Sequence, residues 1–150
     1  EKKVKGFTLV LDGLADPGNL GTIIRIADWF KIDRIICSEN CVDMYGPKVI
    51  QSTMASFMRV DVEYLDLDQF FLNLTESIPI YGMELQGNSI YQNNLPENAI
   101  VIIGSESHGI SDNIKKYITY PISIPSFGKA ESLNAAIATA IVCSEYRRLM

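Results

Sequence analysis

The chain has few cysteine, histidine and tryptophan residues, and it has no long apolar run. Its 150 residues include three cysteines, one histidine and one tryptophan. An odd number of cysteines without a regular spacing argues against a disulfide framework. Cys37 and Cys41 are four residues apart, but His108 is the only histidine, so we expect no metal site. No apolar run approaches the ~20 residues of a membrane-spanning helix, so we expect no membrane contact.

Positive charge is scarce as well. Thirteen Lys and Arg residues against eighteen Asp and Glu residues give a net charge of −5. Domains that bind nucleic acid usually carry a basic surface, so nucleic-acid binding by this chain would need a local basic patch or another domain. The 47% hydrophobic and 21% charged residues are typical of a single globular domain.

Short apolar segments alternate with helical patterns along the whole chain. This alternation predicts an α/β fold, a parallel sheet with helices on both faces. The expected strands cover residues 7–12, 34–37, 58–64, 78–83, 99–103 and 120–124. The expected helices cover residues 19–30, 47–57, 66–77, 114–117 and 134–149.

Three loops that follow strands are rich in glycine and polar residues, namely 12–19, 104–111 and 125–134. Parallel sheets bind ligands at the carboxyl ends of their strands, so we expect these loops to share one site. Ser132 and Asn134 stand where the last helix begins, and helix starts expose unpaired N–H groups that attract ligands. An ordinary helix cap is the alternative interpretation of this segment.

The other two loops carry candidate functional residues. In the first, Thr22, Arg25 and Trp29 lie on the helix face opposite the apolar stripe. This pattern predicts either a solvated face or, because of the tryptophan, a face covered by another subunit. In the second, Glu106 follows a strand-ending glycine, and it is a ligand contact, a loop carboxylate or a helix cap. His108 is either a catalytic residue or, as we favour, a plain loop histidine.

Three segments together resemble a known family. DPGNLGTIIRIA, IIGSESHG and IPSFGKAESLNAAIATA are similar to the three motifs of the SpoU (TrmH-like) RNA 2′-O-ribose methyltransferases, in the SPOUT class. The similarity covers essentially all 150 residues. It implies a SpoU-type catalytic domain over 1–150, with a parallel sheet and a C-terminal trefoil knot. General rules alone would have excluded a knot.

The resemblance also implies a cofactor, partners and site residues. S-adenosyl-L-methionine is expected to bind in the knot, and the active sites are expected at the interface of a homodimer. The residues expected to bind the cofactor are Met83, Glu84, Gly104, Ile124, Ser132 and Leu133. The expected catalytic residues are Asn19, Arg25, Glu106, Ser132 and Asn134.

Within this set, the role of Arg25 is open between two mechanisms. A guanidinium keeps its proton to about pH 12, so we favour a charged Arg25 that clamps the RNA phosphate and stabilises the developing alkoxide. A general base is the alternative. Asn19 and Asn134 are expected to orient Arg25 and the ribose, and Glu106 to fix its loop.

The RNA substrate is open as well. We favour ribosomal RNA over transfer RNA, and we expect a cytoplasmic protein whose N-terminal RNA-binding domain is absent from this chain. The alternatives are a catalytically silent RNA-binding module and a dinucleotide enzyme, although the first loop lacks G-x-G-x-x-G. Gln51 and Ala55 stand where the family usually has Arg and Gly, so a basic contact to RNA at position 51 is lost. Lys48 is either a phosphate contact or an exposed lysine with no specific role.

Overall fold

Six parallel strands form one sheet at the centre of the molecule. The structure, a computed structural model, describes residues 4–53 and 55–150. The strand order is β3-β2-β1-β5-β4-β6, and every neighbouring pair is parallel. The strands span Phe7–Leu11 (β1), Arg34–Ser38 (β2), Val62–Leu65 (β3), Ile80–Ser89 (β4), Ala99–Ile103 (β5) and Tyr120–Ser123 (β6). The predicted α/β class with a parallel sheet is confirmed.

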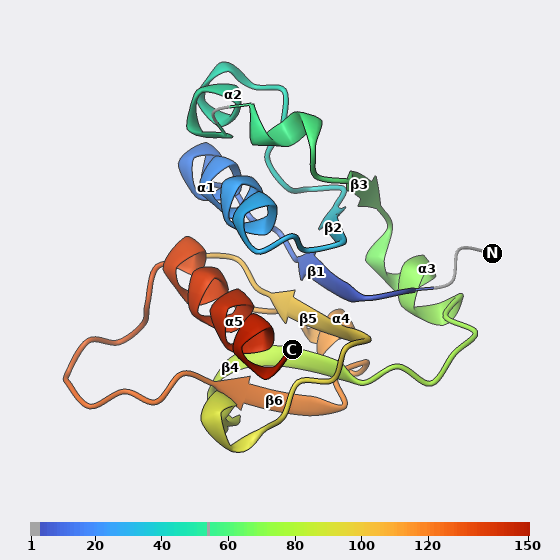
Figure 1. Ribbon diagram of the computed structural model, residues 1–150, viewed down its shortest axis with the longest axis vertical. Helices are drawn as coiled ribbons and strands as arrows, with labels where there is room; N and C mark the ends of the chain where they lie inside the picture. The colour runs from blue at the N-terminus through green and yellow to red at the C-terminus, as the bar shows by residue number, and fades with distance from the viewer. Residues whose placement is uncertain (1–3, 54) are drawn as a thin grey trace.

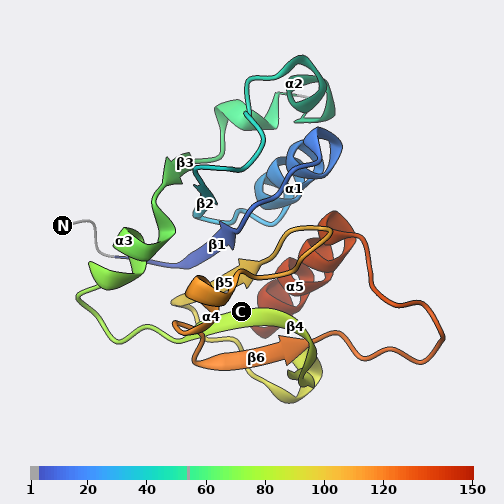
Figure 2. The ribbon, with the colours of Figure 1, turned by 180° about the vertical axis from the view of Figure 1, so that it is seen from behind.

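Helices cover both faces of the sheet (Figures 1 and 2). On one face α1 (Pro17–Trp29) and α5 (Ala135–Leu149) lie side by side, and α2 (Pro47–Thr53) packs on α1. On the other face lie α3 (Leu67–Leu72) and α4 (Asp112–Lys115), with their own apolar cluster against the sheet. Two short 3₁₀ helices complete the chain, Ser56–Met58 (η1) and Ile90–Gln92 (η2).

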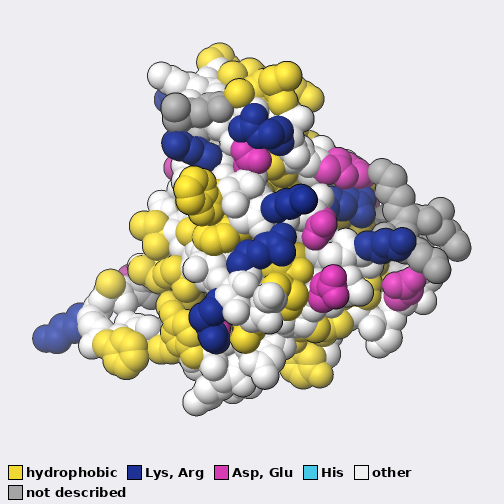
Figure 3. Space-filling model, in the orientation of Figure 1, with side chains coloured by type: hydrophobic (Ala, Val, Ile, Leu, Met, Phe, Trp, Pro, Cys, Tyr) yellow, Lys and Arg dark blue, Asp and Glu magenta, His cyan; other side chains and the backbone are white. Residues whose placement is uncertain are grey.

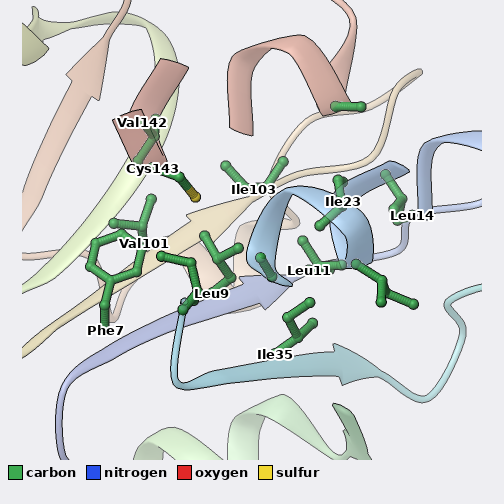
Figure 4. Packing of buried hydrophobic residues seen from close by; sticks show 14 of the residues in the cluster. Phe7, Leu9, Leu11, Leu14, Ile23, Ile35, Val101, Ile103, Val142 and Cys143 are labelled. Carbon is green, nitrogen blue, oxygen red and sulfur yellow. The ribbon is translucent and has the colours of Figure 1, made fainter. Parts of the chain in front are cut away.

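The two central strands, β1 and β5, are buried along their whole length. Strands that are covered on both faces need apolar side chains at every position, which is why their sequences are continuous apolar runs. Figure 4 shows Leu9, Leu11 and Ile103 between the sheet and the helices that carry Ile23 and Val142. The in-register pairing of β1 with β5 places the loops that follow them next to each other.

Several element bounds differ from the prediction. The expected helix 47–57 is broken, because Ala55 has a left-handed φ of +71° between α2 and η1. The expected strand 58–64 is wrong in its first half, since Met58 belongs to η1 and β3 begins at Val62. Met54 lies outside the described residues.

Two further corrections concern α3 and β4. Helix α3 ends at Leu72, five residues before the predicted end. Strand β4 continues to Ser89, because its pairing with β6 resumes after a bulge that follows Met83. Gly87 lies so close to the backbone of β6 that a Cβ there would be 2.6 Å from atoms of Ile122.

No helix within residues 4–53 and 55–150 is long and apolar enough to cross a bilayer. In the same residues, no group of three or more His, Cys, Asp or Glu side chains is placed to hold a metal ion. The predicted thiols Cys37 and Cys41 are both buried. Cys41 donates a hydrogen bond to the Leu11 carbonyl (3.3 Å), so it forms part of the packing under the first loop.

Candidate functional site

A cavity of about 1230 Å³ opens at the carboxyl ends of β1, β4, β5 and β6. The three loops predicted to share one site all contribute to its wall, and so do the end of β4 and the first turn of α5. The cavity therefore lies where ligands bind in open parallel sheets.

The loop after β5 is a tight hairpin. Ser105 and Gly109 exchange two backbone hydrogen bonds of 3.0 Å each, and the Ser105 hydroxyl accepts a third from the His108 amide at 3.0 Å. A Cβ on Gly104 would lie 2.2 Å from the Gly109 backbone, so the hairpin closes only with glycine at position 104. The turn places Glu106 beside the start of α1.

Glu106 holds that start in place. Its carboxylate accepts hydrogen bonds from the Ala15 amide (3.2 Å), the Asp16 amide (3.1 Å) and Asn19 Nδ2 (3.3 Å). Asn134 Nδ2 in turn donates to Asn19 Oδ1 (3.0 Å). Side chains from β5's loop, α1 and α5 therefore form one continuous chain of hydrogen bonds along the cavity wall.

Asn134 ends this chain and begins α5. Its Oδ1 accepts from the amides of Ala136 (2.8 Å) and Ile137 (3.2 Å), as an N-cap does. An amide side chain has two N–H groups, and the contacts above use one on Asn19 and one on Asn134. Each of the two residues thus keeps one N–H for a ligand oxygen, and Asn134 is an ordinary cap and a site residue at once.

The hydrogen bonds also set the charge of Glu106. Burial acts to raise the pKa of this carboxyl, but hydrogen bonds from its own amide and from Ala15, Asp16 and Asn19 outweigh burial and lower the pKa. Glu106 is therefore ionised at neutral pH. A carboxylate that is already committed to three donors is a poor proton acceptor and a good anchor.

All six residues predicted to bind the cofactor line the cavity: Met83, Glu84, Gly104, Ile124, Ser132 and Leu133. His108 lies on the wall as well, with Nδ1 2.7 Å from the Ser107 hydroxyl. The prediction missed Leu85, a residue of β4 that also lines the cavity. Lys48, in the first turn of α2, does not line the cavity.

The cavity is acidic. Four carboxylates lie on its wall, and no Lys or Arg lies there among the described residues. The four acidic residues are Asp16, Glu84, Glu106 and Glu131. Such a field favours a ligand with a positive charge and disfavours phosphate groups.

Arg25 lies outside the cavity. It is exposed on α1, and no hydrogen bond or ion pair joins it to another described residue. It follows Asn19 by six residues, which places it about 9 Å further along the helix and about 120° around it. Trp29, on the same outer face of α1, is 83% exposed. Of the five predicted catalytic residues, the cavity therefore holds Asn19, Glu106, Ser132 and Asn134 but not Arg25.

Known proteins resemble this chain over most of its length. Residues 6–144 match the model of the SpoU rRNA Methylase family. The chain is 32% identical to a 23S rRNA guanosine 2′-O-methyltransferase of Bacillus subtilis, RlmP, over 93% of this chain and 57% of that protein.

Solved structures share the fold as well. A TrmH-family protein from Porphyromonas gingivalis superposes with a TM-score of 0.92 at 45% identity, over 99% of this chain and 61% of the other. An rRNA methyltransferase from Sinorhizobium meliloti with bound AdoMet gives a TM-score of 0.89 at 28% identity, over 98% and 58%. The chain thus spans little more than half the length of these relatives.

Proposed function

Because the chain belongs to the SpoU rRNA Methylase family, we propose that it is the catalytic domain of an RNA 2′-O-ribose methyltransferase. The methyl donor is S-adenosyl-L-methionine, and the acceptor is a ribose 2′-hydroxyl. The observation that carries the proposal is the acidic cavity at the strand ends, with the chain of hydrogen bonds from Glu106 through Asn19 to Asn134 on its wall.

The cavity fits the proposed cofactor in size and chemistry. Its volume, about 1230 Å³, exceeds the ~300–1,000 Å³ typical of a single small ligand, so a second reactant has room. Met83, Ile124 and Leu133 offer apolar surface to an adenine ring. Glu84 is paired with Lys115 (3.8 Å between Oε1 and Nζ), and the other three carboxylates of the wall, which have no described Lys or Arg as an ion-pair partner, favour a sulfonium cation. When bound, S-adenosyl-L-methionine supplies an electrophilic methyl group. A dinucleotide fits less well, because no Lys or Arg on the described wall faces its phosphates.

The side chains on the wall have distinct roles in this proposal. The remaining N–H groups of Asn19 and Asn134 bind the ribose and hold its 2′-hydroxyl in line with the bond that breaks. Ser132, exposed on the same wall, contacts both reactants. Glu106 fixes Asn19 and the two amides before α1 and takes no proton, since its carboxylate is ionised and fully hydrogen-bonded.

The phosphate clamp comes from a second copy of the chain. A single copy offers no described Lys or Arg on the cavity wall, whereas Arg25 stands exposed outside it. Hydrophobic side chains gather over α1 and α5 (Figure 3), and Trp29 (83%), Ile137 (54%) and Leu133 (49%) are exposed there. A homodimer that buries this surface brings Arg25 of one copy to the cavity of the other. Arg25 then stays charged and stabilises the developing alkoxide, and the proton of the 2′-hydroxyl leaves to solvent water as the methyl group moves from sulfur to oxygen.

The substrate proposed is ribosomal RNA, as the name of the Bacillus subtilis relative indicates for that protein. The net charge of −5 leaves much of the RNA contact to a further domain, and the longer relatives have room for one. A cytoplasmic location follows from such a substrate. The trefoil knot belongs to the same proposal, supported by the superposition with family structures.

Methyl transfer from labelled S-adenosyl-L-methionine to bulk RNA tests the proposal in the full-length protein. We expect label in RNA, and alkali resistance of the labelled linkage identifies the 2′-oxygen. Ribosomal and transfer RNA as separate substrates decide between the two classes. Cofactor binding without methyl transfer to any RNA would instead support a catalytically silent RNA-binding module, and tighter binding of NAD would reject the proposed cofactor.

A further inference from the structure

We infer that Asp12 is a positioning residue for the cofactor cavity, acting through the hairpin 104–111. Asp12 directly follows β1, is 8% exposed and does not line the cavity itself. Its carboxylate oxygen Oδ2 accepts two hydrogen bonds from Ser111, one from the amide (2.7 Å) and one from the hydroxyl (2.7 Å). This inference rests on the proposed function, because it assigns the cavity to S-adenosyl-L-methionine.

Asp12 holds both ends of the hairpin. Its backbone amide donates to the Ile103 carbonyl (2.9 Å), directly before Gly104, and its side chain holds Ser111 at the other end. The two ends are therefore fixed to the residue that follows the central strand β1. Without the side-chain contact, Glu106 at the hairpin tip is the only described residue of this loop that is hydrogen-bonded to the start of α1.

The hydrogen bond from the Ser111 hydroxyl to Asp12 supports the same inference. Ser111 is the N-cap of α4, where a serine normally accepts a hydrogen bond from the first helical turn. It makes no such side-chain bond here and donates to Asp12 instead. Helix α4 therefore has no side-chain cap, and the Ser111 hydroxyl instead fixes the end of the hairpin that forms part of the cavity wall.

The consequence for the site is geometric. Asp12 begins the segment that carries Ala15, Asp16 and Asn19, and Ser111 ends the segment that carries Gly104 and Glu106. Both segments line the cavity, so the contact between Asp12 and Ser111 sets their separation at the base while Glu106 sets it at the tip. The backbone groups of Gly104 keep their place only with both contacts.

Three variants test the inference: Asp12→Ala, Ser111→Ala and the control Asn113→Ala. Asp12→Ala removes the acceptor, and Ser111→Ala removes one donor with little risk to the fold. Asn113→Ala breaks a 2.8 Å bond to Asp68 in the same part of the chain, away from the cavity. The readouts are the Kd for S-adenosyl-L-methionine by calorimetry, the Tm, and hydrogen exchange of residues 104–111 in the free protein.

We expect the Kd to rise about 10- to 100-fold in Asp12→Ala and about 3- to 10-fold in Ser111→Ala. Asn113→Ala should lower the Tm about as much as the other two variants do. Its Kd for S-adenosyl-L-methionine should stay within about twofold of that of the unmodified protein. In the full-length enzyme, Ser111→Ala should raise the KM for the cofactor and leave kcat at saturation. The amide hydrogens of residues 104–111 should exchange faster in both Asp12→Ala and Ser111→Ala than in the unmodified protein.

Unchanged cofactor affinity in Asp12→Ala and Ser111→Ala would overturn the inference, and so would an equal loss in Asn113→Ala. If the unmodified chain binds no S-adenosyl-L-methionine, the proposed function fails instead. Hydrogen exchange then still decides on the anchor: unchanged exchange of 104–111 in Asp12→Ala contradicts it, and faster exchange supports it.

Discussion

The cavity wall and the outer face of α1 differ in whether their polar side chains are hydrogen-bonded within the molecule. On the cavity wall, Glu106, Asn19 and Asn134 bind one another and the backbone of two helix starts. On the outer face of α1, Arg25 has no hydrogen bond or ion pair to a described residue and Trp29 is 83% exposed. The wall is acidic, and the outer face carries a cation and an indole.

This contrast supports the proposal that one copy of the chain supplies only part of the site. A preorganised wall can bind a cofactor and orient a ribose, but phosphate recognition needs a cation, and the described wall has no Lys or Arg. The outer face of α1 offers such a cation, Arg25, next to the solvent-exposed side chain of Trp29. The two regions are complementary in charge, as the two sides of a specific interface are.

Replacement of Arg25 should have the largest effect on activity. Arg25→Ala should lower kcat for methyl transfer by about 100- to 1,000-fold, because it removes a preorganised charge from the transition state. The Kd for S-adenosyl-L-methionine should not change, since the proposed partner of Arg25 is the RNA phosphate and not the cofactor. Single-turnover kinetics and calorimetry measure the two quantities. Arg25→Lys separates the mechanisms, and complete loss with RNA binding intact would contradict a purely electrostatic role.

Asn134 comes next, and two variants divide its roles. Asn134→Ala should lower kcat about 10- to 100-fold and cost about 1 kcal/mol of stability, as loss of an N-cap does. Asn134→Ser keeps a capping oxygen but cannot reach Asn19, so it should restore the stability and not the activity. Methyl-transfer assays and denaturant unfolding give both numbers. Normal activity in either variant would remove Asn134 from the catalytic site.

Trp29 tests the outer face directly. Trp29→Ala should weaken the homodimer about 30-fold, which corresponds to the ~2 kcal/mol of an interface hot spot. Sedimentation across a concentration series measures the dimer Kd. Tyr91→Ala is the matched control, because Tyr91 is a 56% exposed aromatic residue on η2, outside α1 and α5. An equal effect of both variants, or of neither, would place the interface elsewhere.

The pH dependence of the free energy of unfolding tests the hydrogen bonds that Glu106 accepts on the cavity wall. Its pKa is lowered in the folded protein from an ordinary value of 4.5, so its stabilisation is fully present above that pH and is lost as pH falls through the lowered pKa. Glu106→Gln should therefore cost about 1 kcal/mol at neutral pH, and the difference should shrink in acid. Denaturant unfolding between neutral and acid pH measures it.

The control for this series is Glu131→Gln. Glu131 lies on the same wall, and no hydrogen bond joins its carboxylate to another described residue. Its replacement should leave stability almost unchanged at neutral pH. A cost in Glu106→Gln that stays constant from neutral to acid pH would show that the carboxylate charge is not what holds the start of α1.

Ala55 should give the smallest effect, and it lies outside both regions. A left-handed φ costs an L-residue about 1–2 kcal/mol, so Ala55→Gly should raise the free energy of unfolding by about 0.5–1 kcal/mol after the entropy cost of glycine. Activity should not change. A loss of stability in this variant would mean that residue 55 does not adopt the left-handed conformation.

The sequence predicted best where local and tertiary demands agree. The strand 99–103 was predicted at its observed bounds, because a strand that is buried on both faces needs an apolar residue at every position. The start of α5 was predicted because Asn134 is a cap in any context. The prediction failed at Ala55, whose backbone conformation a glycine would have revealed, and beyond Met83, where pairing with β6 extends β4.

The site was predicted as a set of loops and not as a set of contacts. Motif order placed Asn19, Glu106 and Asn134 in one site, but their hydrogen bonds depend on the sheet order, which brings residues 115 positions apart within 3.0 Å. The contact between Asp12 and Ser111 spans 99 positions and left no local signal. Helix spacing placed Arg25 on the face opposite the apolar stripe, but its separation from Asn19, Glu106 and Asn134 was not predicted, because it depends on how α1 packs on the sheet.

A mixture of two impaired variants tests the proposed composite site most directly. Arg25→Ala and Asn134→Ala are purified separately, the residual activity of each is measured, and they are then mixed in equal amounts and allowed to exchange subunits. In half of the dimers after random exchange, one site combines an intact Asn134 with the intact Arg25 of the other copy, so about a quarter of the original activity should return. A mixture no more active than its components, with exchange verified, would contradict a site built from two copies.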